Sequence, residues 1–142
     1  MKTYIKIAIF VIFFIAIGGI LAALYFYNLK PKNLQKVKPD FVVTATDFQK
    51  SFEENEKASS EKYINKIIEV SGEIASARPG EKSTLNVSLK TGSDLSSVIC
   101  TFPIVSDTTL FKTGNQITLR GVCSGFLMDV LLNNCAVLKT SK

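Results

Sequence analysis

The first part of the chain is one long apolar run, and the rest alternates between apolar and polar positions. Residues 7–27 contain no charged side chain, and Tyr25, Phe26 and Tyr27 close the run. As a helix this run would be roughly 31 Å long, which matches the hydrocarbon core of a bilayer. Aromatic side chains are typical of the interface between bilayer and water. We predict a transmembrane signal-anchor helix over residues 1–27 that contacts the lipid bilayer through residues 7–27.

A cleaved signal peptide is the alternative interpretation of this segment. Signal peptides have apolar regions of about 7–15 residues, followed by a cleavage site of small residues. Here the nearest small residues, Gly18-Gly19 and Ala22-Ala23, lie inside the apolar run. We therefore favour an uncleaved, single-pass anchor.

Two rules give opposite answers for the side of the membrane on which the rest of the chain lies. Lys2 and Lys6 precede the run, and four lysines come after it before residue 44. Counted literally, the positive-inside rule places the C-terminal part in the cytoplasm. An N-terminal signal-anchor usually exports the C-terminal part of its chain. We expect a periplasmic or other extracytoplasmic domain, with the cytoplasmic arrangement left open.

Residues 28–43 are polar, rich in lysine and interrupted by Pro31 and Pro39. Such a composition predicts an extended linker. Thr44 or Thr46 then offers a helix N-cap, with an acidic or amide side chain three residues later. An apolar stripe comes next at helical spacing, and a second short helix is expected over residues 58–65. We therefore expect a domain over residues 44–142 that begins with an amphipathic helix.

Five later segments alternate apolar and polar residues, which is typical of strands that have one buried face. Their residues are 66–76, 85–90, 98–102, 117–123 and 129–138. Gly72 and Gly121 lie inside strands, where a barrel often requires close backbone approach. The Asn133-Asn134 pair is a candidate bulge. Periodicity by itself predicts a small antiparallel β domain with an N-terminal helix and does not fix the topology. Five short strands with a connector between the third and fourth favour a mainly β, α+β fold: a five-stranded OB-fold Greek-key barrel behind one transmembrane helix.

Both ends of this domain resemble the tRNA_anti-like family. The resemblance covers roughly residues 44–138 and rests on residues 52–58 (FEENEKA), Tyr63, Lys66, 70–72 (VSG), 121–125 (GVCSG), 129–132 (DVLL) and Cys135. It implies an OB-fold behind a short N-terminal membrane or export segment. The family name refers to tRNA anticodon-binding domains, but a shared fold implies structure more strongly than ligand.

The net charge of +5 is confined to the segments that flank the apolar run. Six lysines and one aspartate precede residue 44, whereas the remainder of the chain has eleven basic and eleven acidic residues. A neutral domain lacks the electrostatic attraction that dominates non-specific nucleic-acid binding. The charge therefore favours lipid headgroups over nucleic acid as the partner of the lysines.

The sequence has no histidine and three cysteines without CxxC spacing. Histidine-based catalysis and histidine metal ligands are therefore excluded, and we expect no metal, no cofactor and no enzyme activity. Cys123 and Cys135 flank the last predicted hairpin and are a possible disulfide, as is a bridge from either one to Cys100. The alternative is three buried thiols. Asp129 is expected to bind backbone amides at the hairpin turn.

OB-folds usually bind ligands across their second and third strands, beneath the loops that join strands 1–2 and 4–5. Here these regions are residues 78–82, 86–90 and 126–128. The candidate ligand-binding residues are Arg78, Lys82, Lys90 and Arg120 for phosphates and Phe126 for base stacking. We expect a non-enzymatic, membrane-anchored binding module for a peptide, protein or oligosaccharide. The alternative is a membrane-tethered binder of single-stranded or tRNA-like nucleic acid.

Overall fold

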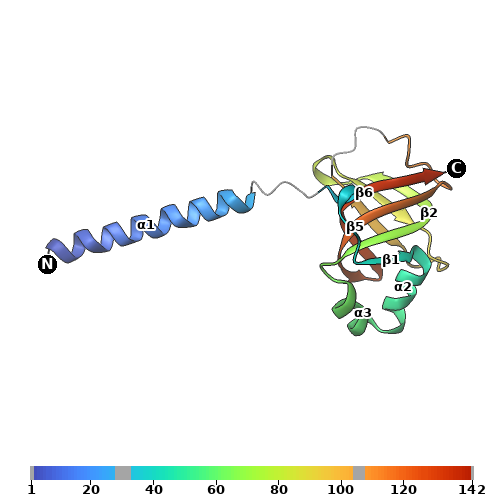
Figure 1. The fold of residues 1–142 in the computed structure, drawn as a ribbon, viewed down its shortest axis with the longest axis horizontal. Helices are drawn as coiled ribbons and strands as arrows, with labels where there is room; N and C mark the ends of the chain where they lie inside the picture. The colour runs from blue at the N-terminus through green and yellow to red at the C-terminus, as the bar shows by residue number, and fades with distance from the viewer. Residues whose placement is uncertain (1, 28–32, 104–107, 142) are drawn as a thin grey trace. The chain divides into compact units, whose positions relative to one another are not determined.

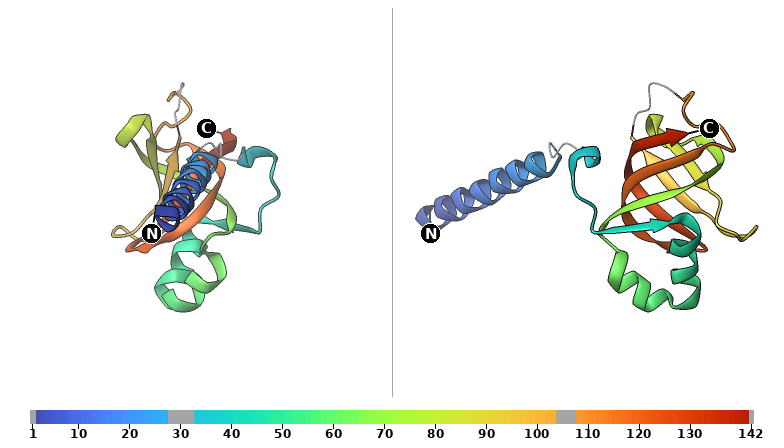
Figure 2. Two further views of the ribbon diagram at one scale, coloured as in Figure 1. Left: turned by 90° about the vertical axis from the view of Figure 1, so that its left-hand side faces the viewer. Right: turned by 45° about the vertical axis from the view of Figure 1, so that its right-hand side comes forward.

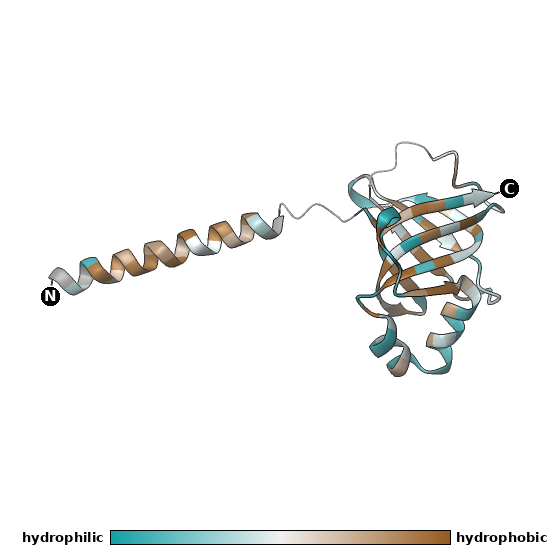
Figure 3. Cartoon of the chain, in the orientation of Figure 1, coloured by the Kyte–Doolittle hydropathy of each residue, from teal (hydrophilic) through white to brown (hydrophobic). Residues whose placement is uncertain are grey.

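The N-terminal unit is a single apolar helix. The computed structural model describes residues 2–27, 33–103 and 108–141, which fall into two compact units, Met1–Lys32 and Asn33–Lys142. Helix α1 (Lys2–Tyr27) is mostly apolar, and Figure 3 shows it brown over much of its length, with teal and white patches between. Within it, Lys6–Tyr25 has a mean hydropathy of 3.0 and the length needed to cross a membrane. The predicted apolar helix is therefore present.

The second unit is a closed five-stranded barrel (Figure 1). Its strands are β2 (Ile67–Pro79), β3 (Leu85–Leu89), β4 (Val98–Phe102), β5 (Gln116–Leu127) and β6 (Asp129–Ser141). The strands pair in the order β2-β3-β4-β6-β5, and β5 returns to β2. All neighbours are antiparallel except β4 and β6, which run parallel. This arrangement confirms the predicted OB-fold.

Two short helices cover one end of the barrel (Figure 2). Helix α2 (Ala45–Glu54) begins after Thr44, whose Oγ1 accepts a hydrogen bond from the Asp47 amide at 3.1 Å. Helix α3 (Glu56–Tyr63) begins two residues before the predicted start, because the Asn55 side chain caps it through the Ala58 amide. These caps satisfy amides that helix formation leaves unpaired.

Aromatic side chains from both helices fill the covered end of the barrel. Phe48 and Phe52 are fully buried, and Phe48 contacts Tyr63 edge to face with ring centroids 5.1 Å apart. The rings join the inward-facing residues of the strands in one core. Each buried aromatic ring contributes about 1.5–3 kcal/mol of hydrophobic stabilisation. The amphipathic helix thus packs on the core, as its apolar stripe predicts.

Residues 33–43 lie against the barrel, although the sequence suggests an extended linker there. Leu34, in the 3₁₀ helix η1 (Leu34–Lys36), is buried, and Phe41 and Val43 pack against the core. Strand β1 (Phe41–Thr44) pairs in parallel with the first half of β2. Three apolar side chains therefore outweigh the polar composition of the segment. Residues 28–32 lie outside the described part of the chain.

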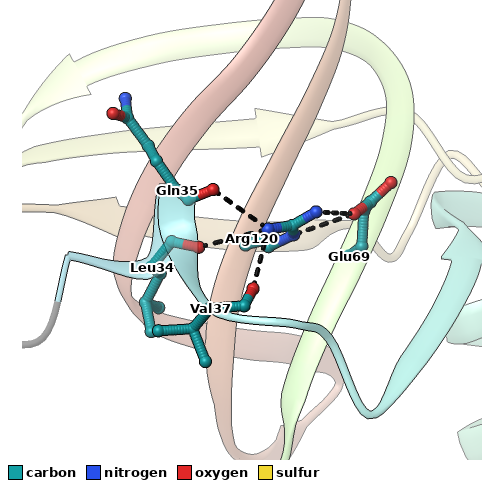
Figure 4. A network of polar contacts seen from close by, with 5 residues as sticks. All are labelled: Leu34, Gln35, Val37, Glu69 and Arg120. Carbon is teal, nitrogen blue, oxygen red and sulfur yellow. Dashed lines mark hydrogen bonds and ion pairs between the residues drawn. The ribbon is translucent and has the colours of Figure 1, made fainter.

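Arg120 on β5 fastens this segment to the barrel wall (Figure 4). Its guanidinium forms a forked ion pair with Glu69, with Nε and Nη2 each 2.8 Å from Oε2. Nη1 donates to the carbonyl oxygens of Val37 at 2.7 Å and Gln35 at 3.1 Å. The planar fork of arginine supplies several donors in fixed directions, which an ammonium group does not.

Asp40 provides a second attachment of the same segment. Its Oδ2 accepts from the Ile67 amide at 2.8 Å, and its own amide donates to the Ile67 carbonyl at 2.8 Å. The Gln35 side chain also donates to the Val137 carbonyl at 3.0 Å. Together with Arg120, these contacts hold the segment 34–40 at both of its ends.

Gly121 allows the interior of the barrel to close around Cys135. A Cβ atom at position 121 would lie 2.6 Å from Cys135 Sγ and 3.1 Å from Leu132 Cβ. The pairing register of β5 and β6 shifts nearby, and Asn134 takes a left-handed conformation with φ of 53°. The predicted close approach at Gly121 and the predicted bulge at Asn133-Asn134 are both confirmed.

We predict that Gly121→Ala lowers the free energy of unfolding by about 1–3 kcal/mol, because the new methyl group overpacks the core. Denaturant unfolding of the full chain in detergent micelles measures this. Gly125→Ala in the same strand is the matched control, since its Cβ would meet no atom within 4 Å. A second change, Cys135→Ala, should restore part of the loss. Equal stability of Gly121→Ala and Gly125→Ala would contradict the packing.

We also predict that Arg120→Lys loosens the segment 34–40 and lowers stability by about 1–3 kcal/mol, because the partly buried Glu69 carboxylate and the carbonyl oxygens lose donors. Amide hydrogen exchange should quicken over residues 34–40 and stay unchanged in β3. Arg78→Lys, at an exposed position, is the control. Unchanged exchange over residues 34–40 would show that Arg120 does not hold them.

Candidate functional site

The five candidate residues from the sequence do not gather at one place. Arg78, at the end of β2, and Lys82, in the 3₁₀ turn η2 (Glu81–Ser83), lie exposed at the end of the barrel opposite α2. Phe126 lies at the end that α2 covers. The strand register separates them, because Pro79 pairs with Leu85 at one end of β3 and the β5–β6 hairpin turn adjoins the other end.

Three of the five candidates already have partners within the barrel. Arg120 engages Glu69 and the segment 34–37, as described above. Lys90 forms an ion pair with Glu73. The Phe126 ring stacks on Phe52, with centroids 5.2 Å apart and planes 20° from parallel. Of the five, Arg78 and Lys82 are the pair exposed together at one end.

The outward face of β3 and β4, where OB-folds usually bind ligands, is uncharged and mostly polar between its ends. Its side chains are Asn86 and Ser88 on β3 and Ile99 and Thr101 on β4. Thr101 Oγ1 donates to Asn86 Oδ1 at 2.9 Å, so these two groups satisfy each other. This face offers hydrogen bonds but no cluster of positive charge for phosphates.

A groove with an apolar lining lies at the helix-covered end of the barrel. Leu95 from the β3–β4 loop and Leu127 and Met128 from the β5–β6 hairpin are 84%, 78% and 71% exposed. The groove has a volume of about 720 Å³; we call it the apolar groove, and its lining is Glu53, Glu56, Ser93, Leu95, Ser96, Phe126, Leu127 and Met128. Exposed apolar side chains that gather in one place are typical of binding surfaces.

Asp129 ties the two loops that carry these apolar side chains. Its Oδ1 accepts from the Ser97 amide at 2.6 Å and from Ser97 Oγ at 2.8 Å. Within the β3–β4 loop, Thr91 Oγ1 donates to the Ser96 carbonyl at 2.6 Å. The aspartate therefore binds a backbone amide, as predicted, but the amide belongs to the neighbouring loop.

Gln49 and Glu53 of α2 tie the helix to both loops. The Gln49 side chain, 1% exposed, donates through Nε2 to the Met128 carbonyl at 2.8 Å and to Glu53 Oε1 at 3.2 Å. Ser96 Oγ donates to the same Glu53 oxygen at 2.8 Å. These hydrogen bonds hold both loops against α2, and a pre-formed groove of this kind would lower the entropy cost of binding a ligand.

The sequence located only part of this groove. The stretch 126–128 lay within the predicted ligand-binding loops, but Leu95, Glu53 and Glu56 were not singled out. Leu95 is the one large apolar residue in the loop of residues 90–97. An apolar side chain in a loop of Gly, Ser, Thr and Asp is the local signal that could have pointed to it.

The three cysteines are buried free thiols in this structure. Burial raises the pKa of Cys123 to about 11, and it raises the pKa of Cys100 well above its ordinary value, with a further contribution from a hydrogen bond to Cys135. The reactive thiolate is therefore scarce near neutral pH. A Cys123–Cys135 bridge stays a prediction. Among the described residues, no three His, Cys, Asp or Glu side chains cluster as metal ligands would.

One solved structure shares this fold at low sequence identity, and two others are more distantly similar. A proposed nucleic acid-binding lipoprotein of Klebsiella pneumoniae subsp. pneumoniae is 20% identical, with a TM-score of 0.53 over 68% of this chain and 91% of that one. An asparaginyl-tRNA synthetase of Entamoeba histolytica is 12% identical, with a TM-score of 0.41 over 55% of this chain. A proposed aspartyl-tRNA synthetase of Leishmania major is 11% identical, with a TM-score of 0.46 over 80% of this chain.

The chain spans 22% of the length of each synthetase. No curated protein matches it. The tRNA_anti-like family model matches residues 1–137, which include the N-terminal helix and nearly the whole barrel. The chain therefore belongs to the tRNA_anti-like family.

Proposed function

We propose that this protein is a membrane-anchored, non-enzymatic OB-fold module that binds a peptide or protein segment in the apolar groove. The observation that carries the proposal is the convergence of Leu95, Leu127 and Met128, all more than 70% exposed, between loops that hydrogen bonds hold in place. Apolar side chains in water cost free energy that a partner recovers by covering them. A family of binding domains and a chain without histidine agree with a non-enzymatic role.

A nucleic-acid ligand is the second candidate. The name of the Klebsiella lipoprotein and the exposed Arg78 and Lys82 favour it. Two observations weigh against it. The eleven basic and eleven acidic residues after position 43 cancel. The other two basic candidates, Lys90 and Arg120, are engaged by Glu73 and Glu69. An oligosaccharide would use the outward face of β3 and β4, whose side chains Asn86, Ser88, Ile99 and Thr101 include no aromatic ring to stack on a sugar.

The tether in this proposal is helix α1 itself. Its length and uninterrupted apolar surface suit a membrane span. A lipid attached to cysteine is not an alternative near this helix, since the first cysteine of the chain is Cys100. We place the barrel on the extracytoplasmic side, in line with the usual behaviour of signal-anchors.

Selection from a randomised peptide library tests the binding function on the full chain in detergent micelles. We expect selected peptides to lose roughly ten-fold or more in affinity when Leu127→Ser removes an apolar wall, since burial of a leucine contributes about 1.5–3 kcal/mol. Val42→Ser, at a residue 66% exposed on β1, is the matched control. Binding of single-stranded RNA at physiological salt, lost in an Arg78→Ala, Lys82→Ala double variant, would instead establish the nucleic-acid function.

N-terminal sequencing of the protein from washed membranes tests the tether. We expect the protein to stay in the membrane fraction and to begin at or next to Met1, because an uncleaved apolar helix resists extraction. A mature N-terminus after Gly19 or Ala23 would show a cleaved signal peptide.

Protease added to cells with a permeabilised outer envelope tests the side of the membrane on which the barrel lies. The protease should degrade the barrel; an intact barrel would place it in the cytoplasm.

A further inference from the structure

We infer that the apolar groove selects a cationic partner: a peptide segment that presents apolar side chains together with lysine or arginine. This inference rests on the proposed function and adds the charge of the ligand to it. Three features at the groove support it, namely the sign of its charges, the type of its free hydrogen-bonding atoms and the partners that its charge disfavours.

Both charged residues of the groove lining are carboxylates. Glu53 comes from α2 and Glu56 from the first turn of α3, and no lysine or arginine is among the lining residues. Neither of the lysines nearby in sequence lines the groove: Lys50 forms an exposed pair with Glu54 at 3.7 Å, and Lys57 is not among the lining residues. A barrel that is neutral as a whole therefore presents negative charge at its apolar surface.

One buried acceptor beside the groove has no hydrogen-bond partner. Gln49 Oε1 is buried and has no hydrogen-bond partner, while Nε2 of the same amide serves Met128 and Glu53. Gln49 borders a small adjoining cavity of about 280 Å³, which shares Glu53 and Ser93 with the apolar groove and is also lined by Lys50. A buried acceptor without a donor costs about 1–3 kcal/mol. Because Oε1 is buried, a donor from a ligand would recover this cost only if the side chains that cover Oε1 moved aside. Ammonium and guanidinium groups bring donors and no acceptors.

The same charges disfavour the other occupants that an apolar surface attracts. An anionic bilayer would bring phosphate groups against Glu53 and Glu56. A second copy in a symmetric dimer would bring the same two carboxylates together across the interface. A nucleic acid would bring phosphates as well. A cationic peptide is the occupant whose charge complements the rim, and charge complementarity mainly sets specificity and association rate.

Three matched synthetic peptides test the inference on the full chain in micelles of an uncharged detergent. One alternates leucine with lysine, the second leucine with glutamate, and the third serine with lysine. We expect the leucine–lysine peptide to bind about ten-fold more tightly than either of the others. Glu56→Lys should weaken its binding about five-fold. Glu61→Lys changes the net charge equally at an exposed position of α3 outside the groove, so it is the control and should have little effect.

The outcomes separate this inference from the function on which it rests. If Leu127→Ser abolishes peptide binding but Glu56→Lys and Glu61→Lys behave alike, the groove binds peptides and the charge preference is wrong. Preference for the leucine–glutamate peptide would also overturn the inference. If the wild-type chain binds no peptide, the proposed function fails. Self-association of the wild-type chain that Leu127→Ser abolishes would identify a second copy as the occupant.

Discussion

The closure of one barrel end by aromatic side chains is the constraint on which the rest of the domain depends. The interior of a five-stranded barrel has to be covered at both ends, and here Phe48, Phe52 and Tyr63 cover one of them. Their rings set the position of α2 and α3 against the β5–β6 hairpin through the stack of Phe52 on Phe126. The same aromatic packing that stabilises the core therefore also determines which residues of α2 and α3 lie beside the β5–β6 hairpin.

The apolar groove results from that placement. Once α2 is seated by its aromatic face, its neighbouring positions 49 and 53 point at the two loops and bond to Met128 and Ser96. Met128 takes a left-handed conformation with φ of 65° at the hairpin turn, an uncommon conformation for a residue other than glycine. Such backbone strain persists only where surrounding contacts enforce it. The Gln49 contact to the Met128 carbonyl is one of these.

Patterns that repeat along the sequence predicted the strands of the barrel, whereas its topology was inferred from the number of strands and the family resemblance. Alternation of period two located all five strands, because each has one face in the core, and Thr44 marked the start of α2. Strand β1 and helix η1 were missed because they bury only a few residues amid lysines and prolines. Gly121 was informative because a glycine inside a strand implies a neighbour too close for a side chain, here Cys135.

The site was harder to predict because it depends on which strands lie side by side. Arg120 had the chemistry of a phosphate ligand, but the β2–β5 register places it opposite Glu69, and opposite charges across a strand pair attract. Leu95 and Leu127 are 32 positions apart in the chain, and each alone is an ordinary exposed residue. Their meeting requires the β3–β4 loop and the last hairpin to share one barrel end, which no local pattern encodes.

The fastening of residues 34–40 has a mechanical consequence. If α1 is held in a bilayer, any force transmitted along the backbone meets the Arg120 fork and the Asp40–Ile67 hydrogen bonds before it reaches α2. These contacts would therefore bear the force first. A pulling force on α1 would then be balanced by these contacts on the outer wall of the barrel, and the apolar groove at the barrel end would keep its shape.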